Sequence, residues 1–283
     1  MKHIVGFSGG IDSQAVALWV RNRYPKEDVI LTNSNAGEWE HWLTEQFIDS
    51  YSDSVHPVTR CNAIVADMWK TPGFAETKGL DGSVTLTFAE MVRIKGRPPS
   101  RKAQFCTDKL KLSPQRRWID AQRQPGGSLT DGYVRYSGVR RDESEARKNA
   151  AIFAWDDFFD CDLICPIADW TKQMCFDYVK AHGEAINPLY ALGFNRVGCS
   201  PCINSGREEI LNWAARFPEV IDRVSALERS TGRTFFAPMV PGLYMNNIEQ
   251  VLDWARCSYG GRQSMFPILH EREGCESKYG LCE

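Results

Sequence analysis

The chain of 283 residues is 43% apolar and 25% charged, and its formal net charge is −2. These values are ordinary for a globular protein and give no general attraction to a polyanion, so a nucleic acid would have to be held by a local basic patch. The sequence has no basic leader ahead of an apolar stretch and no apolar run near the roughly 18 residues of a membrane span, which predicts a cytoplasmic protein with no membrane partner.

Short strands alternate with helical segments at the start of the chain. Residues 3–8 have the pattern of a buried strand, a glycine pair follows, and the apolar positions of residues 16–20 indicate a helix. Residues 28–37 and 54–59 are predicted to be two further strands. This order is typical of an α/β fold with a twisted parallel sheet flanked by helices, in which ligands bind at the carboxyl ends of the strands.

The middle of the chain continues the same alternation. Helices are predicted over residues 86–94 and 112–123, the second with Pro114 near its first turn, and a strand over residues 132–141. Residues 142–155 are predicted to be loop or helix, and residues 162–167 the last strand of the sheet. A helix over residues 171–183 ends at a glycine.

From residue 196 onward the sequence is mostly helical, with helices predicted over residues 207–232 and 246–257. We therefore expect an α/β domain over residues 1–195 and a smaller, cysteine-containing helical region over residues 196–283.

A basic segment runs from residue 93 to residue 117 with a single acid, Asp108. A solvated helix face is one interpretation, but Gly96, Pro98 and Pro99 interrupt any helix, which favours a patch that binds a polyanion. The basic residues of the segment are Arg93, Lys95, Arg97, Arg101, Lys102, Lys109, Lys111, Arg116 and Arg117.

Ten cysteines in a cytoplasmic chain indicate metal ligation or thiol chemistry rather than disulfides. Cys199 and Cys202 form a CxxC motif, and Cys275 and Cys282 lie near the C-terminus. Three others lie in apolar segments and are expected to be small buried side chains, namely Cys161, Cys165 and Cys175.

The segment FSGGIDS, residues 7–13, follows the first predicted strand and opens the first predicted helix. Its glycines allow the backbone to approach a phosphate, its N–H groups converge with the positive end of the helix, and Ser8 and Ser13 offer hydroxyl groups. The lysine of a Walker loop is missing, and Asp12 and Ser13 follow the glycines instead. Such a loop suits a pyrophosphate that leaves as a unit.

This segment resembles the SGGxDS signature of the PP-loop, or N-type, ATP pyrophosphatases, which cleave ATP between the α- and β-phosphates and adenylate an oxygen of their substrate. Residues 104–115, 136–147 and 187–202 resemble, in order, three elements of the phosphoadenosine phosphosulfate (PAPS) reductase family. The resemblance covers about residues 3–210 and implies a Rossmann-like, adenine nucleotide alpha hydrolase-like fold. The nucleotide-binding residues that it implies are Ser8, Gly9, Gly10, Ile11, Asp12, Ser13, Gly138, Arg140 and Arg141.

The catalytic residues expected from the same motifs are Asp12, Ser13, Lys109 and Arg140. ATP cleavage requires Mg²⁺, which Asp12 is expected to orient directly or through water, and Asp12 could cap the following helix as well. One lysine of the pair Lys109 and Lys111 is expected to reach the α-phosphate. Arg147 either binds phosphate or pairs with Glu143 at helical spacing.

Several members of the resembled family hold a [4Fe–4S] cluster. The matching positions here are Cys106, Cys199 and Cys202, with Cys275 or, alternatively, Cys282 as the fourth ligand, or with the iron left open to bind sulfide. A Zn²⁺ ion held by the CxxC motif and the two terminal cysteines is the alternative, because thiolates suit either metal.

The resemblance includes two chemistries. Reductases of the family bind an already activated adenylyl sulfate and usually lack part of the SGGxDS loop, whereas the loop is complete here, and the YGLCE terminus does not match their C-terminal cysteine motif. The complete loop favours an ATP-driven thiolation enzyme, closest in character to the ATP pyrophosphatase component of DNA phosphorothioation systems. Its implied partners are a nucleic acid (DNA rather than tRNA), a cysteine desulfurase or other sulfur donor, and other subunits of a modification system. The alternatives are a PAPS or adenylyl sulfate reductase and a non-catalytic, zinc-stapled nucleotide-binding subunit.

Overall fold

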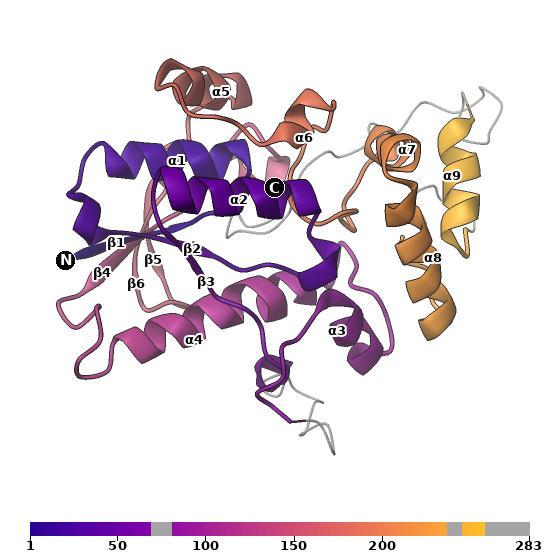
Figure 1. Ribbon diagram of the computed structural model, residues 1–283, viewed down its shortest axis with the longest axis horizontal. Coiled ribbons are helices and arrows are strands. Elements are labelled where there is room, and N and C mark those ends of the chain that lie inside the picture. The colour runs from indigo at the N-terminus through magenta and orange to yellow at the C-terminus, as the bar shows by residue number, and fades with distance from the viewer. Residues whose placement is uncertain (69–80, 237–244, 258–283) are drawn as a thin grey trace.

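The computed structural model describes residues 1–68, 81–236 and 245–257 and contains a six-stranded sheet of order β3-β2-β1-β4-β6-β5 (Figure 1). All neighbouring strands are parallel except β5 and β6, which pair antiparallel at one edge. The strands are β1 (Lys2–Gly6), β2 (Val29–Asn33), β3 (Val58–Arg60), β4 (Tyr133–Tyr136), β5 (Phe153–Asp156) and β6 (Cys161–Ile164). The order 3-2-1-4 of the first four strands is that of doubly wound, Rossmann-like folds, as expected from the sequence.

Helices cover both faces of the sheet (Figure 1). One face packs against α1 (Ile11–Arg21), α2 (Trp42–Ser54) and α5 (Lys172–Ala181), and the other against α4 (Ser113–Gln122). Strand β1 shows why both faces are apolar: Val5 lies in the cluster with α1, and its neighbour Ile4 lies in the cluster with α4. Successive side chains of a strand point to opposite faces, so a buried central strand is apolar throughout.

Two predicted elements differ from the structure. Residues 54–59 were expected to form a strand, but α2 extends to Ser54 and β3 begins only at Val58. Residues 142–155 were expected to be loop or helix, but their last three residues belong to β5, which runs antiparallel at the sheet edge. Phe153 and Trp155 are 72% and 58% exposed there, so no buried face gave the strand a readable apolar alternation.

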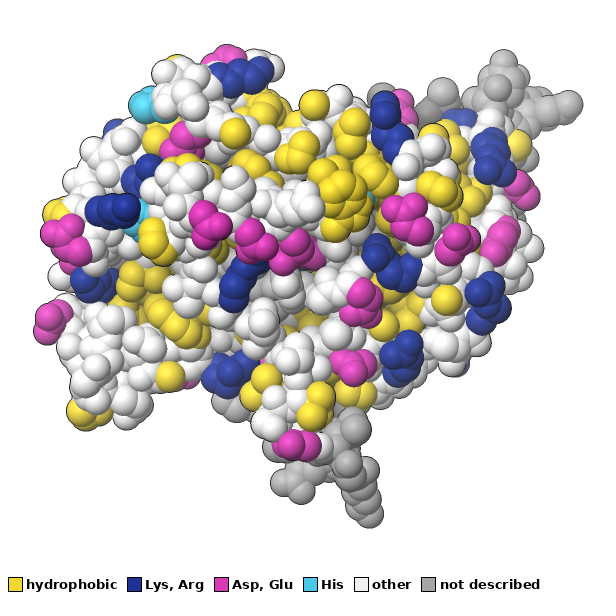
Figure 2. Space-filling model, viewed as in Figure 1, with side chains coloured by type: hydrophobic (Ala, Val, Ile, Leu, Met, Phe, Trp, Pro, Cys, Tyr) yellow, Lys and Arg dark blue, Asp and Glu magenta, His cyan; other side chains and the backbone are white. Residues whose placement is uncertain are grey.

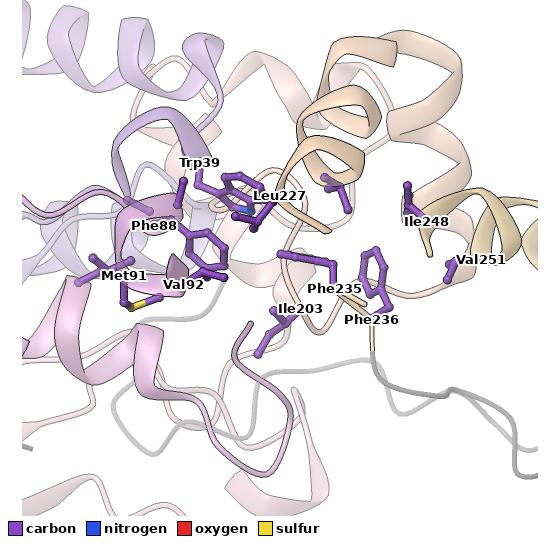
Figure 3. Packing of buried hydrophobic residues seen from close by; sticks show 14 of the residues in the cluster. Trp39, Phe88, Met91, Val92, Ile203, Leu227, Phe235, Phe236, Ile248 and Val251 are labelled. Carbon is purple, nitrogen blue, oxygen red and sulfur yellow. The ribbon is translucent and has the colours of Figure 1, made fainter. Parts of the chain in front are cut away.

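The C-terminal helices are α7 (Arg207–Arg216), α8 (Pro218–Thr231) and α9 (Ile248–Arg256). They share one buried cluster with the segment before α2 and with α3 (Phe88–Lys95), shown in Figure 3. In that view Trp39 and Phe88 face Leu227 and Phe235, and Ile248 lies beyond them. The ring centroids of Trp39 and Phe235 lie 5.6 Å apart, so this core contains residues from both sides of the domain boundary expected at residue 196.

None of the helices in the described part of the chain combines the length and the apolar character needed to cross a membrane.

Candidate functional site

The turn between β1 and α1 is held by its two serines. The Oγ atoms of Ser8 and Ser13 lie 3.1 Å apart, the backbone N–H of Ser8 donates to Ser13 Oγ at 3.2 Å, and Ser13 Oγ donates to the carbonyl of Gly10 at 2.9 Å. These short-range bonds close the turn, so its N–H groups are oriented before a ligand arrives. The expected phosphate loop is therefore a preformed feature at the carboxyl end of β1.

Two glycines let neighbouring segments approach this loop closely. Gly9 has a φ of +81°, and a Cβ there would lie 3.1 Å from Ile48 and 3.2 Å from Thr44 of α2. A Cβ on Gly138, just after β4, would lie 3.2 Å from the carbonyl carbon of Asp12. Because β1 and β4 are neighbours, the segments that leave their carboxyl ends meet at the switch point of the sheet.

The segment after β4 delivers Arg140 to Asp12. The Nε atom of Arg140 lies 2.8 Å from Oδ1 of Asp12, and both side chains are about 95% buried, with exposures of 5% and 4%. Arg140 also pairs with Asp142. Burial lowers the pKa of Arg140, but Asp12 and Asp142, with a smaller effect from Cys175, together outweigh burial and raise that pKa. Asp12 does not cap α1, since the N-cap residue is Gly10 and Asp12 lies in the first turn.

A cavity of about 230 Å³ opens in front of this ion pair. Besides Ile11, Asp12 and Arg140, the cavity is lined by Asp142, Glu143, Lys172, Tyr190, Asn195, Arg196, Asn204, Gly206, Glu208 and Glu209. The sequence predictions missed the second wall, which Lys172 and residues 190–209 contribute. Tyr190 and Arg196 lie in the motif at residues 187–202, which could have identified them, whereas Lys172 and Glu208 carried no sequence signal.

Three cations expected at the nucleotide lie outside this lining. Arg141 pairs with Asp169 on the surface and donates from Nε to the carbonyl of Ala150 at 2.9 Å. Arg147 pairs with Glu143, which was one of the two roles expected for it, the other being phosphate binding. Lys109 pairs with Asp108 at 3.1 Å in the π-helical turn Thr107–Leu112.

Three of the predicted metal ligands lie near one another around the half-buried Lys111. Burial lowers the pKa of Lys111, but Cys199, Glu40, Cys202 and Cys106 together outweigh burial and raise it. Burial raises the pKa of the Cys106 thiol to about 12, and that of Cys199 also shifts upward through burial. In the described ranges no three or more His, Cys, Asp or Glu residues are placed to hold a metal ion. The expected fourth ligands, Cys275 and Cys282, lie outside those ranges.

The basic segment does not form one continuous surface. Lys109 is buried, Arg116 pairs with Asp120, and Arg117 pairs with Asp67. Five of its cations are exposed, namely Arg93, Arg97, Arg101, Lys102 and Arg117. Arg97, Arg101 and Lys102 lie in the turn that follows α3, and Arg93 lies in the last turn of that helix.

Comparison with known proteins gives a family match over most of the chain. The family described as the phosphoadenosine phosphosulfate reductase domain matches residues 2–205. A protein of Escherichia phage 186, named as a 37.8 kDa protein in the gpa 5′ region, is 30% identical over 99% of this chain and 96% of its own length. Adenosine 5′-phosphosulfate reductase of Streptomyces coelicolor is 44% identical, but the match covers 26% of this chain and 33% of the reductase. A crystal structure of phosphoadenylyl-sulfate reductase from Candida auris superposes with a TM-score of 0.45 and 12% identity, covering 70% of this chain and 81% of that one.

Proposed function

The chain belongs to the phosphoadenosine phosphosulfate reductase domain family, and we propose that it is an ATP pyrophosphatase of this family, located in the cytoplasm. It would cleave ATP between the α- and β-phosphates and adenylate an oxygen, which sulfur then replaces. The observation that carries the proposal is the complete SGGIDS loop, closed by Ser8 and Ser13 and placed beside the buried cation Arg140. Such a loop can hold a departing pyrophosphate without the lysine of a Walker motif.

The residues of the loop supply binding and charge stabilisation. The N–H groups at the start of α1 and the positive end of that helix attract phosphate oxygens. Arg140 offers a guanidinium fork that matches phosphate geometry and can stabilise the charge that develops as the α–β bond breaks. Asp12 holds this guanidinium in place at 2.8 Å, so the arginine is oriented before ATP binds.

The site also fits Mg²⁺, which commonly binds through one or two carboxylates together with phosphate oxygens. The carboxylates of Asp12 and Asp142 both line the cavity, and either would hold the ion. When bound, Mg²⁺ neutralises the charge of the triphosphate.

The three cysteines Cys106, Cys199 and Cys202 supply part of a ligand set for a metal ion or an iron–sulfur cluster. Cys106, Cys199 and Cys202 raise the pKa of the same lysine, Lys111, so the three thiols lie near one another beside a cation that favours thiolates. We propose that they bind a [4Fe–4S] cluster, with Zn²⁺ as the alternative and with Cys275 or Cys282 as the fourth ligand. Either metal would stabilise the CxxC loop, and an iron–sulfur cluster would add electron transfer or sulfide binding.

The proposed acceptor is a nucleic acid, with the DNA backbone phosphate favoured over tRNA. The exposed cations Arg93, Arg97 and Arg101 support this proposal, because phosphate contacts dominate nucleic-acid affinity. On the face drawn in Figure 2, Lys and Arg side chains alternate with Asp and Glu, so that face offers no continuous basic surface. A cysteine desulfurase or other sulfur donor and other subunits of a modification system complete the proposed set of partners.

A reductase of PAPS or adenylyl sulfate is the second candidate. It is favoured by the match to the adenosine 5′-phosphosulfate reductase of Streptomyces coelicolor, which is 44% identical over 78 residues. The complete phosphate loop favours ATP as the substrate instead.

Incubation with ATP labelled at the α-phosphate, Mg²⁺, duplex DNA, a cysteine desulfurase and cysteine tests the proposal. Release of AMP and pyrophosphate, together with sulfur in the DNA, is expected. Asp12→Ala should abolish AMP release, whereas Asp49→Ala, a change on the exposed side of α2, should not. Sulfite release from adenylyl sulfate with thioredoxin would identify a reductase, and nucleotide binding without turnover would identify a non-catalytic subunit.

A further inference from the structure

The first helical turn of α1 leaves backbone donors that the helix cannot satisfy. Gln14 is the residue whose N–H makes the first bond of the helix, to the carbonyl of Gly10 at 3.0 Å. The N–H of Ile11 precedes it and has no acceptor within the helix. That N–H donates instead to the hydroxyl of Tyr190, at 2.9 Å. A side chain 179 residues away in the sequence thus satisfies a donor of the phosphate loop.

Tyr190 is presented by a fixed element. Its short helix α6 (Pro188–Ala191) is capped by Asn187, whose Oδ1 accepts the N–H of Leu189 at 3.0 Å. The Nδ2 atom of Asn187 donates to Thr44 Oγ1 at 3.2 Å, and both Asn187 and Leu189 are fully buried. Thr44 is also, with Ile48, one of the two α2 residues against which Gly9 packs. The loop and α6 therefore share one support on α2, which fixes the backbone of Tyr190 relative to the loop.

The ring of Tyr190 lines the same cavity as Arg140, with Lys172 Nζ 5.5 Å from the ring centroid. We propose that the Tyr190 hydroxyl occupies the position of a phosphate oxygen on the loop and is displaced when a pyrophosphate group binds. This inference rests on the proposed function of the loop. A hydroxyl oxygen and a phosphate oxygen that accept the same N–H compete for one position, and the tyrosine can leave by rotating its side chain while α6 stays in place.

The consequence is that Tyr190 limits the affinity of the loop. The empty loop keeps its Ile11 donor satisfied, and the ligand must replace one hydrogen bond before it gains its own. An enzyme that releases pyrophosphate benefits, because a competing hydroxyl speeds the departure of the product.

The test compares Tyr190→Phe with wild type, using inorganic pyrophosphate as the probe in titration calorimetry. Loss of one competing hydrogen bond should tighten pyrophosphate binding by about 2- to 10-fold. The matched control is Tyr178→Phe. The Tyr178 hydroxyl accepts a hydrogen bond from Asn22 at 3.3 Å and does not line the cavity, so its removal should leave the affinity for pyrophosphate unchanged. In turnover assays Tyr190→Phe should lower the KM for ATP, as expected when ground-state and transition-state binding change together.

Unchanged or weaker pyrophosphate binding by Tyr190→Phe would overturn the inference, since a merely structural tyrosine would not tighten binding when altered. Thermal unfolding of both variants identifies any loss of folding. If wild type binds pyrophosphate but releases no AMP from ATP, the proposed function fails while the calorimetric comparison still decides the role of Tyr190. If wild type binds no pyrophosphate, both fail.

Discussion

Replacing Arg140 with Met tests whether the ion pair at the loop is structural, functional or both. The guanidinium pairs with Asp12 at 2.8 Å, and the two side chains are only 5% and 4% exposed. Removing one partner of a buried pair leaves the other charge without compensation, which costs about 3–5 kcal/mol of unfolding free energy. Asp12→Asn should cost less, about 1–3 kcal/mol, because Arg140 keeps its ion pair with Asp142 and no buried charge of opposite sign is left alone.

The chain contains a matched control for this change. Arg135 and Asp156 form a second pair at 2.8 Å with exposures of 4% and 3%, but neither residue lines the cavity. Arg135→Met should therefore lower the unfolding free energy by a similar amount, about 3–5 kcal/mol, without changing the affinity for pyrophosphate. Arg140→Met should lower both.

Urea unfolding and calorimetric titration with pyrophosphate measure the two quantities. If Arg140→Met does not fold, the double variant with Asp12→Asn removes the uncompensated carboxylate and should restore part of the stability. An Arg140→Met protein within about 1 kcal/mol of wild type would refute the reasoning on burial. Equal weakening of pyrophosphate binding in Arg135→Met would refute the assignment of Arg140 to the phosphate site.

Three further predictions concern other parts of the molecule. Gly138→Ala should weaken pyrophosphate binding in calorimetry, because the added Cβ would meet the backbone of the phosphate loop at 3.2 Å. Unchanged affinity would contradict this, since it would mean that the loop can shift away from the Cβ without changing its binding of pyrophosphate. Burial lowers the pKa of His41 to about 4, so its stabilising effect is present above the ordinary value of 6.5 and is lost as the pH falls towards 4. His41→Asn keeps an N-cap residue for α2. Between pH 7 and pH 4 the unfolding free energy of this variant, measured with urea, should fall by up to about 3 kcal/mol less than that of wild type; an equal fall in both proteins would contradict this. Changing both Cys199 and Cys202 to Ser should remove iron and the brown colour from anaerobically prepared protein, whereas the exposed Cys257→Ser should not; iron retained by the double variant would remove the CxxC motif from the ligand set.

The fold and one wall of the site could be predicted from the sequence because their signals are local. Gly9 and Gly10 follow a buried strand and open a helix, so the loop was readable from residues that touch one another along the chain. Arg140 was predicted as a site residue because it follows a strand. Its ion pair with Asp12 became visible only in the structure, where β1 and β4 are neighbours.

The second wall of the cavity could not be predicted, because it depends on tertiary packing. Lys172 and Glu208 lie in ordinary amphipathic helical sequence, and only the placement of α5 and α7 brings them to the cavity. The basic segment, in contrast, predicted more free positive charge than the structure shows. Lys109 and Arg117 belong to a basic segment by sequence, yet each has a carboxylate partner within 4 Å that the linear pattern does not reveal.

The segment from Trp39 to Ile48 connects the two candidate chemical centres. At one end, the carbonyl of Trp39 accepts the N–H of Ser200 at 2.7 Å and its indole donates to the carbonyl of Pro201 at 3.1 Å, inside the CxxC loop. At the other end, Ile48 packs against Gly9 of the phosphate loop. Trp39 and Ile48 are both buried, at 1% and 0% exposure, so neither end can shift without disturbing a core cluster. The cysteine loop and the phosphate loop thus have a common rigid support, and a chemistry that uses both would find them held at a fixed separation.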